Sequence, residues 1–465
     1  MKSRLLCLAV LAAAPLAAAI EGPVKVDGGL VSGLPARDAS IIAFKGIPFA
    51  APPVGDLRWR APQPVIPWQG VRKAADFGTS CVQTLTPGKK GFGPWTWEFL
   101  TQNQVGEDCL TLNVWTPAKS PRAKLPVFVW IYGGGFNSGS SEVPLYDGEG
   151  LASKGLIVVT INYRVGILGF FAHPELTKES GHNASGNQGL LDQVAALQWV
   201  HRNIAAFGGD PARVTIAGQS AGAMSVMELL TSPLTNGLFH GAIVQSGVSC
   251  LMDAATAAHM QGETLASAEA AGVAFATKQG ATSLKDLRAL PWQTLLKASP
   301  AGVHFVPIVD GYLEPSADGK LHDVATMAGC TTGEISTGVM GGGPPNPAAA
   351  EQRLSALYQW ARERAATAKK PAYLYLWDHV LPGPDAARYG AFHSSELAYV
   401  LNTLHASDRP FTDADRKIAE MMSSYWANFV TTGNPNGTGV PKWPAVSDKK
   451  EVMEVGDHTG PVPLK

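Results

Sequence analysis

Short apolar segments alternate with segments of helical periodicity through the middle of the chain. Segments 125–134 (LPVFVWIYGG) and 155–163 (GLIVVTINY) are rich in β-branched and aromatic residues, as buried strands are. Segment 187–207 has apolar residues at helical spacing and is followed by two glycines. Further strands are expected at 213–218, 240–247, 324–329 and 372–377. This alternation predicts an α/β fold with a mostly parallel, twisted central sheet and helices on both faces.

The composition is that of a chain with a large core and no polyanionic partner. Apolar residues make up 45% of the 465 residues and charged residues 16%. Lys and Arg number 37 against 38 Asp and Glu, so no surplus of positive charge is available to neutralise nucleic-acid phosphates. The length would allow about three domains. Because large α/β enzymes often fill such a length with one core and its insertions, we expect residues 20–465 to form a single domain.

The N-terminus is typical of a secretory signal peptide. Lys2 and Arg4 precede an apolar run that ends in the small residues Ala17-Ala18-Ala19. The run is shorter than the roughly 20 residues that a membrane-spanning helix needs, and no later stretch is long and apolar enough. We therefore expect residues 1–19 to be removed, a mature chain that begins near Ile20 or Glu21, a secreted or periplasmic location, and no stable membrane insertion.

Four cysteines remain in the mature chain, namely Cys81, Cys109, Cys250 and Cys330. An even count in an exported protein predicts two disulfides, for which three connectivities are possible. The sequence has neither a CxxC motif nor an HExxH motif, and no His lies near these cysteines at metal-ligand spacing. No metal site or other cofactor is therefore expected.

The clearest chemical motif is Gly218-Gln219-Ser220-Ala221-Gly222, which lies between an expected strand and an apolar helix. G-x-S-x-G in this setting is typical of a nucleophile elbow, where a sharp turn exposes the serine hydroxyl at the carboxyl end of the sheet. Small residues flank the serine because the chain approaches itself closely there. A purely structural Gly-Ser-Gly turn is the alternative. The placement between strand and helix favours a nucleophilic Ser220.

A second glycine-rich turn follows the segment at 125–131. Gly133, Gly134 and Gly135 would let backbone N–H groups face a ligand without obstruction from side chains. With the amide of Ala221, the amides of Gly134 and Gly135 would form an oxyanion hole. The alternatives are a flexible turn or a phosphate-binding loop, but neither G-x-x-x-x-G-K-[ST] nor G-x-G-x-x-G in its strand context is present.

Several longer strings resemble the type-B carboxylesterase/cholinesterase-like family of α/β-hydrolases over nearly the whole mature chain. They are FKGIPFAAPPVGDLRWRAPQP, EDCLTLNVWTP, VWIYGGGFNSGS, NYRVGILGF, GNQGLLDQVAALQWVHRNIAAFGGDP, VTIAGQSAGAMSV, QSG and WANFVTTGNPNG. Their order along the chain is also that of the family. The resemblance implies an α/β-hydrolase fold in which loop and helix insertions form a gorge, and a bacterial secreted carboxylesterase.

The resemblance also implies a catalytic triad in the order Ser, acid, His. Glu334 matches the family's acid and His393 its histidine, whereas Asp310 and His379 are alternatives that fit less well. The family usually has an acidic residue just before the catalytic acid, and here that position is Gly333. Ser246 resembles the family's serine near the acid, although a simple strand-end serine is an equally good interpretation.

The same resemblance implies a disulfide between Cys81 and Cys109. Cys250 and Cys330 then remain, each near the end of one of two adjacent expected strands, and their pairing is left open. The function implied is hydrolysis of small-molecule carboxylic esters through an acyl-enzyme, without a cofactor. An amide or carbamate hydrolase with the same triad is the alternative, since triad and oxyanion hole serve every acyl transfer. A non-catalytic binding protein is disfavoured because Ser220, Glu334 and His393 are all present.

Substrate preference is expected to favour uncharged esters, bulky ones included. Cholinesterases of the family carry a glutamate just before the nucleophile, and here that position is the neutral Gln219. Trp95 and Trp97 lie between Cys81 and Cys109, and either could stand near the family's choline-site tryptophan or line an apolar site. His393 follows Glu334 by only 59 positions, which is short for the family and predicts a wide entrance.

Overall fold

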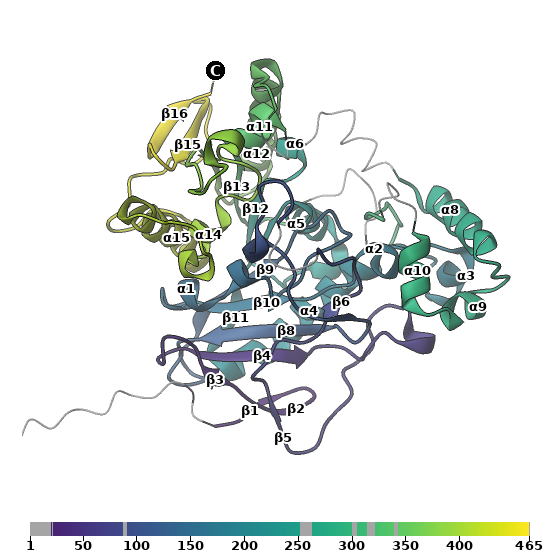
Figure 1. The fold of residues 1–465 in the computed structure, drawn as a ribbon. Coiled ribbons are helices and arrows are strands. Elements are labelled where there is room, and N and C mark those ends of the chain that lie inside the picture. The colour runs from purple at the N-terminus through teal and green to yellow at the C-terminus, as the bar shows by residue number, and fades with distance from the viewer. Residues whose placement is uncertain are drawn as a thin grey trace, which may run out of the picture.

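One sheet of eleven strands runs through the molecule (Figure 1). The computed structural model describes residues 20, 22–86, 91–251, 263–299, 305–313, 321–338 and 343–464, so the signal peptide expected at residues 1–19 lies outside the described residues. In spatial order the strands are β16 (Gly460–Pro463), β15 (Glu451–Val455), β14 (Ala372–Trp377), β13 (Ala325–Thr331), β12 (Gly241–Gln245), β11 (Gly209–Gln219), β9 (Leu125–Ile131), β10 (Ile157–Ile161), β8 (Thr111–Thr116), β4 (Ile42–Pro48) and β3 (Leu34–Pro35).

The middle of this sheet is parallel. Every neighbouring pair from β10 through β9, β11, β12, β13 and β14 to β15 is parallel. The outer pairs, which are β3 with β4, β4 with β8, β8 with β10 and β15 with β16, are antiparallel. The carboxyl ends of the parallel strands therefore meet at one edge, where the connecting loops can share a site.

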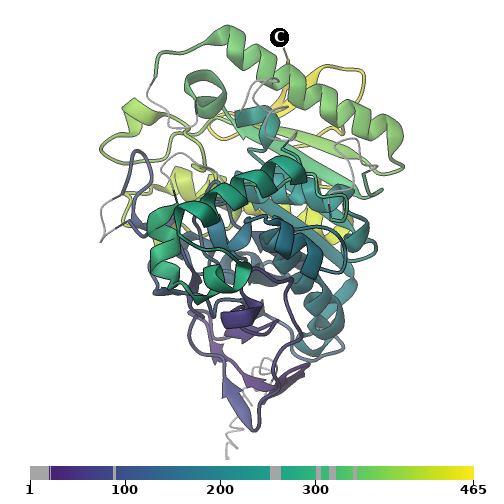
Figure 2. The same cartoon turned by 90° about the vertical axis from the view of Figure 1, so that its right-hand side faces the viewer.

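Helices cover both faces of the sheet, as Figures 1 and 2 show. The helix α5 (Ala221–Thr231) packs on β11 and β12 beside α4 (Gln188–Asn203), and α15 (Asp413–Thr432) packs on β9 and β11 from the other face. In the part of the chain that the structure describes, the remaining α-helices are α1 (Glu149–Ala152), α2 (Gly166–Gly169), α3 (Pro174–Glu179), α6 (Val248–Leu251), α8 (Leu265–Lys278), α9 (Leu284–Ala289), α10 (Trp292–Ala298), α11 (Thr332–Thr337), α12 (Pro347–Thr367), α13 (Ala386–Tyr389) and α14 (Leu397–Val400).

Shorter elements complete the N-terminal half. One small sheet joins β1 (Val24–Val26), β2 (Gly29–Ser32) and β5 (Val71–Lys73), and another pairs β6 (Ser80–Cys81) with β7 (Val105–Gly106). The 3₁₀ turns are η1 (Gly55–Leu57), η2 (Trp97–Phe99), η3 (Pro144–Tyr146), η4 (Ile204–Phe207), η5 (Pro233–Thr235) and η6 (Leu404–Ala406). No helix in these described ranges has the length and apolar character needed to cross a bilayer.

The expected α/β fold and its mostly parallel sheet are confirmed. The apolar runs at 125–131 and 157–161 are buried on both sides, which explains why they lack alternation. The helix expected at 187–207 forms as α4 and then tightens into η4, which ends at Gly208 with φ 84°.

Candidate active site

Ser220 lies at the turn between β11 and α5. Its backbone has φ 59° and ψ −127°, which a non-glycine residue adopts only under constraint. The flanking glycines are required by space: a Cβ at Gly218 would lie 2.3 Å from the carbonyl oxygen of Gly222, and a Cβ at Gly222 would lie 2.1 Å from that of Ile131. The Ser220 amide donates to the carbonyl of Gln245 at 3.0 Å, which ties the turn to β12. The expected elbow therefore forms.

The glycine turn after β9 lies directly against this elbow. A Cβ at Gly133 would be 2.5 Å from the Gln219 carbonyl and 2.9 Å from the Ser220 Cβ. Gly134 and Gly135 have φ of 123° and 62°, and within the described chain their amides donate no hydrogen bond. The Ala221 amide opens α5, where a helix N–H has no intrahelical acceptor. In the described chain, the amides of Gly134, Gly135 and Ala221 are thus free to donate, two from the glycine turn and one from the elbow.

Glu334 lies at the end of β13, in the first turn of α11. One carboxylate oxygen accepts the Thr331 amide at 2.8 Å, and the Glu334 amide donates to the Thr331 hydroxyl at 3.2 Å, which completes a capping box. The other oxygen accepts a hydrogen bond from Nδ1 of His393. Glu334 is fully buried and His393 is 4% exposed, so this carboxylate and imidazole form a pair sheltered from water.

The structure brings His393 to Glu334 but does not join it to Ser220. Within the described residues, no hydrogen bond links the Ser220 hydroxyl to the imidazole. The Nε2 of His393 instead lies 3.1 Å from the side-chain nitrogen of Gln219. Catalytic hydrogen bonds are often loose before a substrate binds. Gln219, predicted to lie beside the nucleophile, thus contacts the histidine directly.

A second buried carboxyl group lies behind this pair. Glu396 lies three residues after His393, is fully buried, and accepts from the Gln245 side chain at 3.3 Å. Its other oxygen has no hydrogen-bond partner within the described chain. Burial, followed by the charge of Glu334, raises the pKa of Glu396 to about 7. Sequence reasoning missed this residue, and its only signal was an acid in the apolar segment SSELAYV.

Ser246 also lies behind the elbow. It is fully buried with φ 53°, its amide donates to the Gly329 carbonyl at 2.8 Å, and its hydroxyl has no partner among the described residues. The two less favoured triad candidates lie elsewhere. His379 bridges Asp457 and Asp415 at 2.6 and 2.9 Å, and Asp310 accepts amides of its own turn.

Both disulfides form. Cys81 joins Cys109, as the family resemblance implied, and Cys250 joins Cys330. The sulfurs of the second disulfide and a carboxylate oxygen of Glu334 all lie within 4.8 Å of one another. Because both sulfurs are in the disulfide bond, this group offers no thiolate for a metal.

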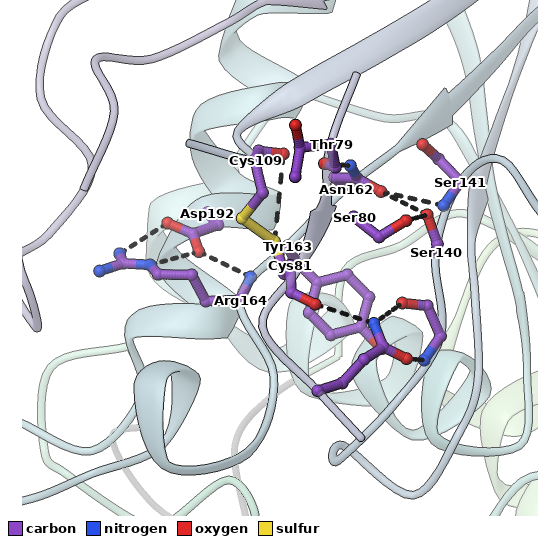
Figure 3. Close-up of a disulfide and its surroundings, with 12 residues drawn as sticks. Thr79, Ser80, Cys81, Cys109, Ser140, Ser141, Asn162, Tyr163, Arg164 and Asp192 are labelled. Atoms are coloured by element: carbon purple, nitrogen blue, oxygen red, sulfur yellow. Dashed lines mark hydrogen bonds and ion pairs between the residues drawn. A yellow bond between two sulfur atoms is a disulfide. The ribbon is translucent and has the colours of Figure 1, made fainter. Parts of the chain in front are cut away.

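Two buried polar contacts lie near the Cys81–Cys109 disulfide (Figure 3). The buried Arg164 pairs with Asp192 through two hydrogen bonds of 2.8 and 2.7 Å, and next to Cys81 the Ser80 hydroxyl donates to that of Ser140 at 2.8 Å. The Ser80–Ser140 contact holds the chain next to Cys81, whereas the Arg164–Asp192 pair joins the segment after β10 to α4.

The two tryptophans in the segment between Cys81 and Cys109 have different neighbours. The ring of Trp95 lies 6.3 Å from the His393 ring in an edge-to-face arrangement. The Trp97 indole nitrogen instead donates to Asp408 at 3.2 Å. Trp95 is thus the tryptophan that the structure places beside the predicted site, and it remains partly exposed.

Fold and site together define an α/β-hydrolase with a serine elbow beside a buried carboxylate–imidazole pair. The model of the Carboxylesterase family matches residues 21–352 and 354–463, so this chain belongs to that family. It is 35% identical to fumonisin B1 esterase of Sphingopyxis macrogoltabida, with 96% of this chain and 89% of that protein covered.

Two further relatives are animal proteins. The chain is 31% identical to human cocaine esterase, with 93% of this chain and 86% of that protein covered. It is 33% identical to the medium-chain fatty acyl-CoA hydrolase precursor of Anas platyrhynchos, with 90% and 85% covered. Family and relatives show that the chain is a carboxylesterase.

Proposed function

We propose that the chain hydrolyses uncharged carboxylic esters through an acyl-enzyme on Ser220. The observation that carries this proposal is the buried Glu334–His393 pair beside a strained, glycine-flanked serine. A carboxylate on Nδ1 holds the imidazole in the tautomer that leaves Nε2 free to accept a proton, and it stabilises the imidazolium that forms.

The reaction has two halves. Oγ of Ser220 attacks the ester carbonyl carbon while its proton passes to Nε2 of His393, which gives up its contact with Gln219. The amides of Gly134, Gly135 and Ala221 donate to the resulting oxyanion. The carbon–oxygen bond to the alcohol then breaks, and the alcohol leaves with the proton from His393. Water then attacks the carbonyl carbon of the acyl-enzyme while one of its protons passes to His393. The bond to Oγ of Ser220 breaks, Oγ takes that proton back, and the carboxylic acid leaves.

Substitution of the nucleophile tests this mechanism. Ser220→Ala should fold normally, lose covalent labelling by an organophosphate and lose ester hydrolysis by at least about 10⁴-fold. Ser225→Ala, a buried serine of the same helix that contacts Gln193, is the matched control and should retain labelling. Near-normal hydrolysis in purified Ser220→Ala, or an organophosphate adduct on another serine of the wild-type protein, would contradict the proposal.

We also propose that the enzyme is exported and acts outside the cytoplasm, in the periplasm or the medium. The basic start, apolar run and Ala17-Ala18-Ala19 support removal of residues 1–19. Two disulfides fit an oxidising compartment. N-terminal sequencing of enzyme recovered outside the cytoplasm should start near Ile20, and an intact Lys2 on that material would overturn this proposal.

A further inference from the structure

The guanidinium group of Arg409 joins three separate segments of the chain. Its Nε donates to the carboxylate of Glu98 at 2.8 Å. One terminal nitrogen donates to the Thr96 hydroxyl at 2.7 Å and to the Pro94 carbonyl at 3.2 Å. The other donates to the Pro382 carbonyl at 3.2 Å. We call this group of contacts the Arg409 latch.

The Arg409 latch is largely buried, and its two charged groups have several hydrogen-bond partners. The side chains of Arg409 and Glu98 are 14% and 2% exposed. The Glu98 carboxylate also accepts from the hydroxyls of Thr96 at 2.7 Å and Ser407 at 3.0 Å. Breaking a buried, hydrogen-bonded ion pair leaves an uncompensated charge. The segment that carries Glu98 therefore has one strongly preferred position.

The latch holds Trp95 from both sides. Two of its acceptors belong to Pro94 and Thr96, the residues on either side of Trp95 in the chain. Fixing both neighbours fixes where the indole leaves the backbone. That indole lies 6.3 Å from the rings of both Phe392 and His393.

A second chain of contacts leads to the same histidine. The Arg409 guanidinium lies over the ring of Phe99 at 5.8 Å. Phe99 in turn packs on Phe392 at 5.9 Å, and Phe392 directly precedes His393. The latch thus positions two aromatic side chains against the turn that carries the histidine.

We propose that Arg409 is a positioning residue that, through Glu98 and Thr96, holds Trp95 as the aromatic wall of the ester site and so sets the preference for bulky esters. This inference rests on the proposed role of His393. Trp95 makes the contact with substrate, whereas Arg409 acts only through it. Without the latch the wall is free to move, and a large acyl group loses its packing surface while acetate does not.

The test compares two substrates, p-nitrophenyl acetate and p-nitrophenyl benzoate. Arg409→Gln and the milder Thr96→Val should lower kcat/KM for the benzoate about tenfold more than for the acetate, mainly through KM. Arg409→Lys, which keeps the charge and some hydrogen bonds, should restore part of the selectivity. The fraction of sites titrated by an organophosphate should stay unchanged.

The matched control is Arg58→Gln, which breaks a second buried ion pair, formed with Glu107 of the Cys81–Cys109 segment. Arg58 and Glu107 have side chains 7% and 11% exposed and a 2.6 Å contact near the Cys81–Cys109 disulfide. Arg58→Gln should lower the free energy of unfolding with little effect on the ratio of kcat/KM for the benzoate to kcat/KM for the acetate. Equal effects of Arg58→Gln and Arg409→Gln on that ratio, or no change in either, would overturn the proposal.

A double-mutant cycle with Trp95→Ala keeps the proposal testable if Arg409→Gln folds poorly. Trp95→Ala should itself reduce the preference for benzoate, and adding Thr96→Val should change it no further, because the wall is already gone. Additive losses would contradict the proposal. Absence of any organophosphate-titratable site in the wild-type protein would instead count against the proposed function.

Discussion

Glu396 and Glu334 are two buried carboxyl groups of one site, and they differ in their hydrogen-bond partners. Glu334 has the imidazole of His393 and the Thr331 amide as partners. Glu396 has the neutral amide of Gln245, which is itself held by the Trp426 indole at 3.1 Å. Because a buried charge without a cation is costly, Glu396 keeps its proton up to a pH of about 7.

This raised pKa predicts a specific dependence of stability on pH. The folded protein keeps the Glu396 proton to a pKa of about 7, whereas the unfolded chain loses it near the usual 4.5. The stability it contributes is therefore full below pH 4.5 and is lost as the pH rises to about 7, by up to about 3 kcal/mol. Glu396→Gln should flatten this fall in urea unfolding measured from pH 4.5 to 8.

The exposed Glu351→Gln on α12 is the control for this measurement and should leave the pH profile unchanged. An identical pH profile for Glu396→Gln and the wild-type protein would show that Glu396 is ionised in the folded state across this range.

Single residues of the candidate site could be predicted from the sequence where a local motif marks them. Ser220 and the glycine turn stand out because a nucleophile elbow and the turn facing it need glycines at fixed spacing, and Glu334 and His393 were predicted through resemblance to a family. Arg409 and Glu98 could not be found this way. They are 311 residues apart, and only the folded chain shows that an arginine in a polar loop and a glutamate between aromatic residues meet in a buried pair.

At the level of elements, the Cys250–Cys330 disulfide ties α6 to β13. Cys330 directly precedes Thr331, which caps the helix that carries Glu334. The Cys81–Cys109 disulfide instead closes the segment that carries Trp95. The two bridges therefore lie in different places, one close to Glu334 and one at the ends of the segment that carries Trp95.

Removing each bridge should have a different kinetic effect. In the chain-entropy model the double variants Cys250→Ala/Cys330→Ala and Cys81→Ala/Cys109→Ala lose about 4.5 and 3.6 kcal/mol of stability. The first should lower kcat for all esters, because Glu334 loses its support. The second should mainly raise KM for bulky esters. Unfolding and steady-state kinetics on both variants check this, and equal effects on kcat would contradict it.

The alternation of strands and helices was sufficient to predict the parallel strands from β10 to β14. It did not reveal β15, whose residues are only partly apolar and whose partner β16 contains two prolines. It also gave no placement for β4, whose pairing with β8 shifts register between Phe44 and Ile47. Strands next to the sheet edges, such as β15 and β4, each have an antiparallel neighbour and lack the long apolar runs that mark the central parallel strands.

For the whole molecule, we expect no preference for cationic esters. The position before Ser220 holds the neutral Gln219, and Glu396 is shielded from solvent. A cation on the Trp95 face would gain about 0.5–2 kcal/mol at most. We therefore expect kcat/KM for butyrylcholine to be no higher than for its uncharged isostere 3,3-dimethylbutyl butyrate. A clear preference for the cation would mean that Trp95 forms a choline site.

Both edges of the central sheet carry proline. At one edge β3 has only two residues and ends at Pro35, and at the other β16 reads Gly460-Pro461-Val462-Pro463. The Leu464 amide donates inward to Lys450, so by alternation positions 461 and 463 face outward, where proline has no N–H. A neighbouring copy thus finds few donors with which to extend the sheet, and the enzyme should resist fibril formation even when crowded.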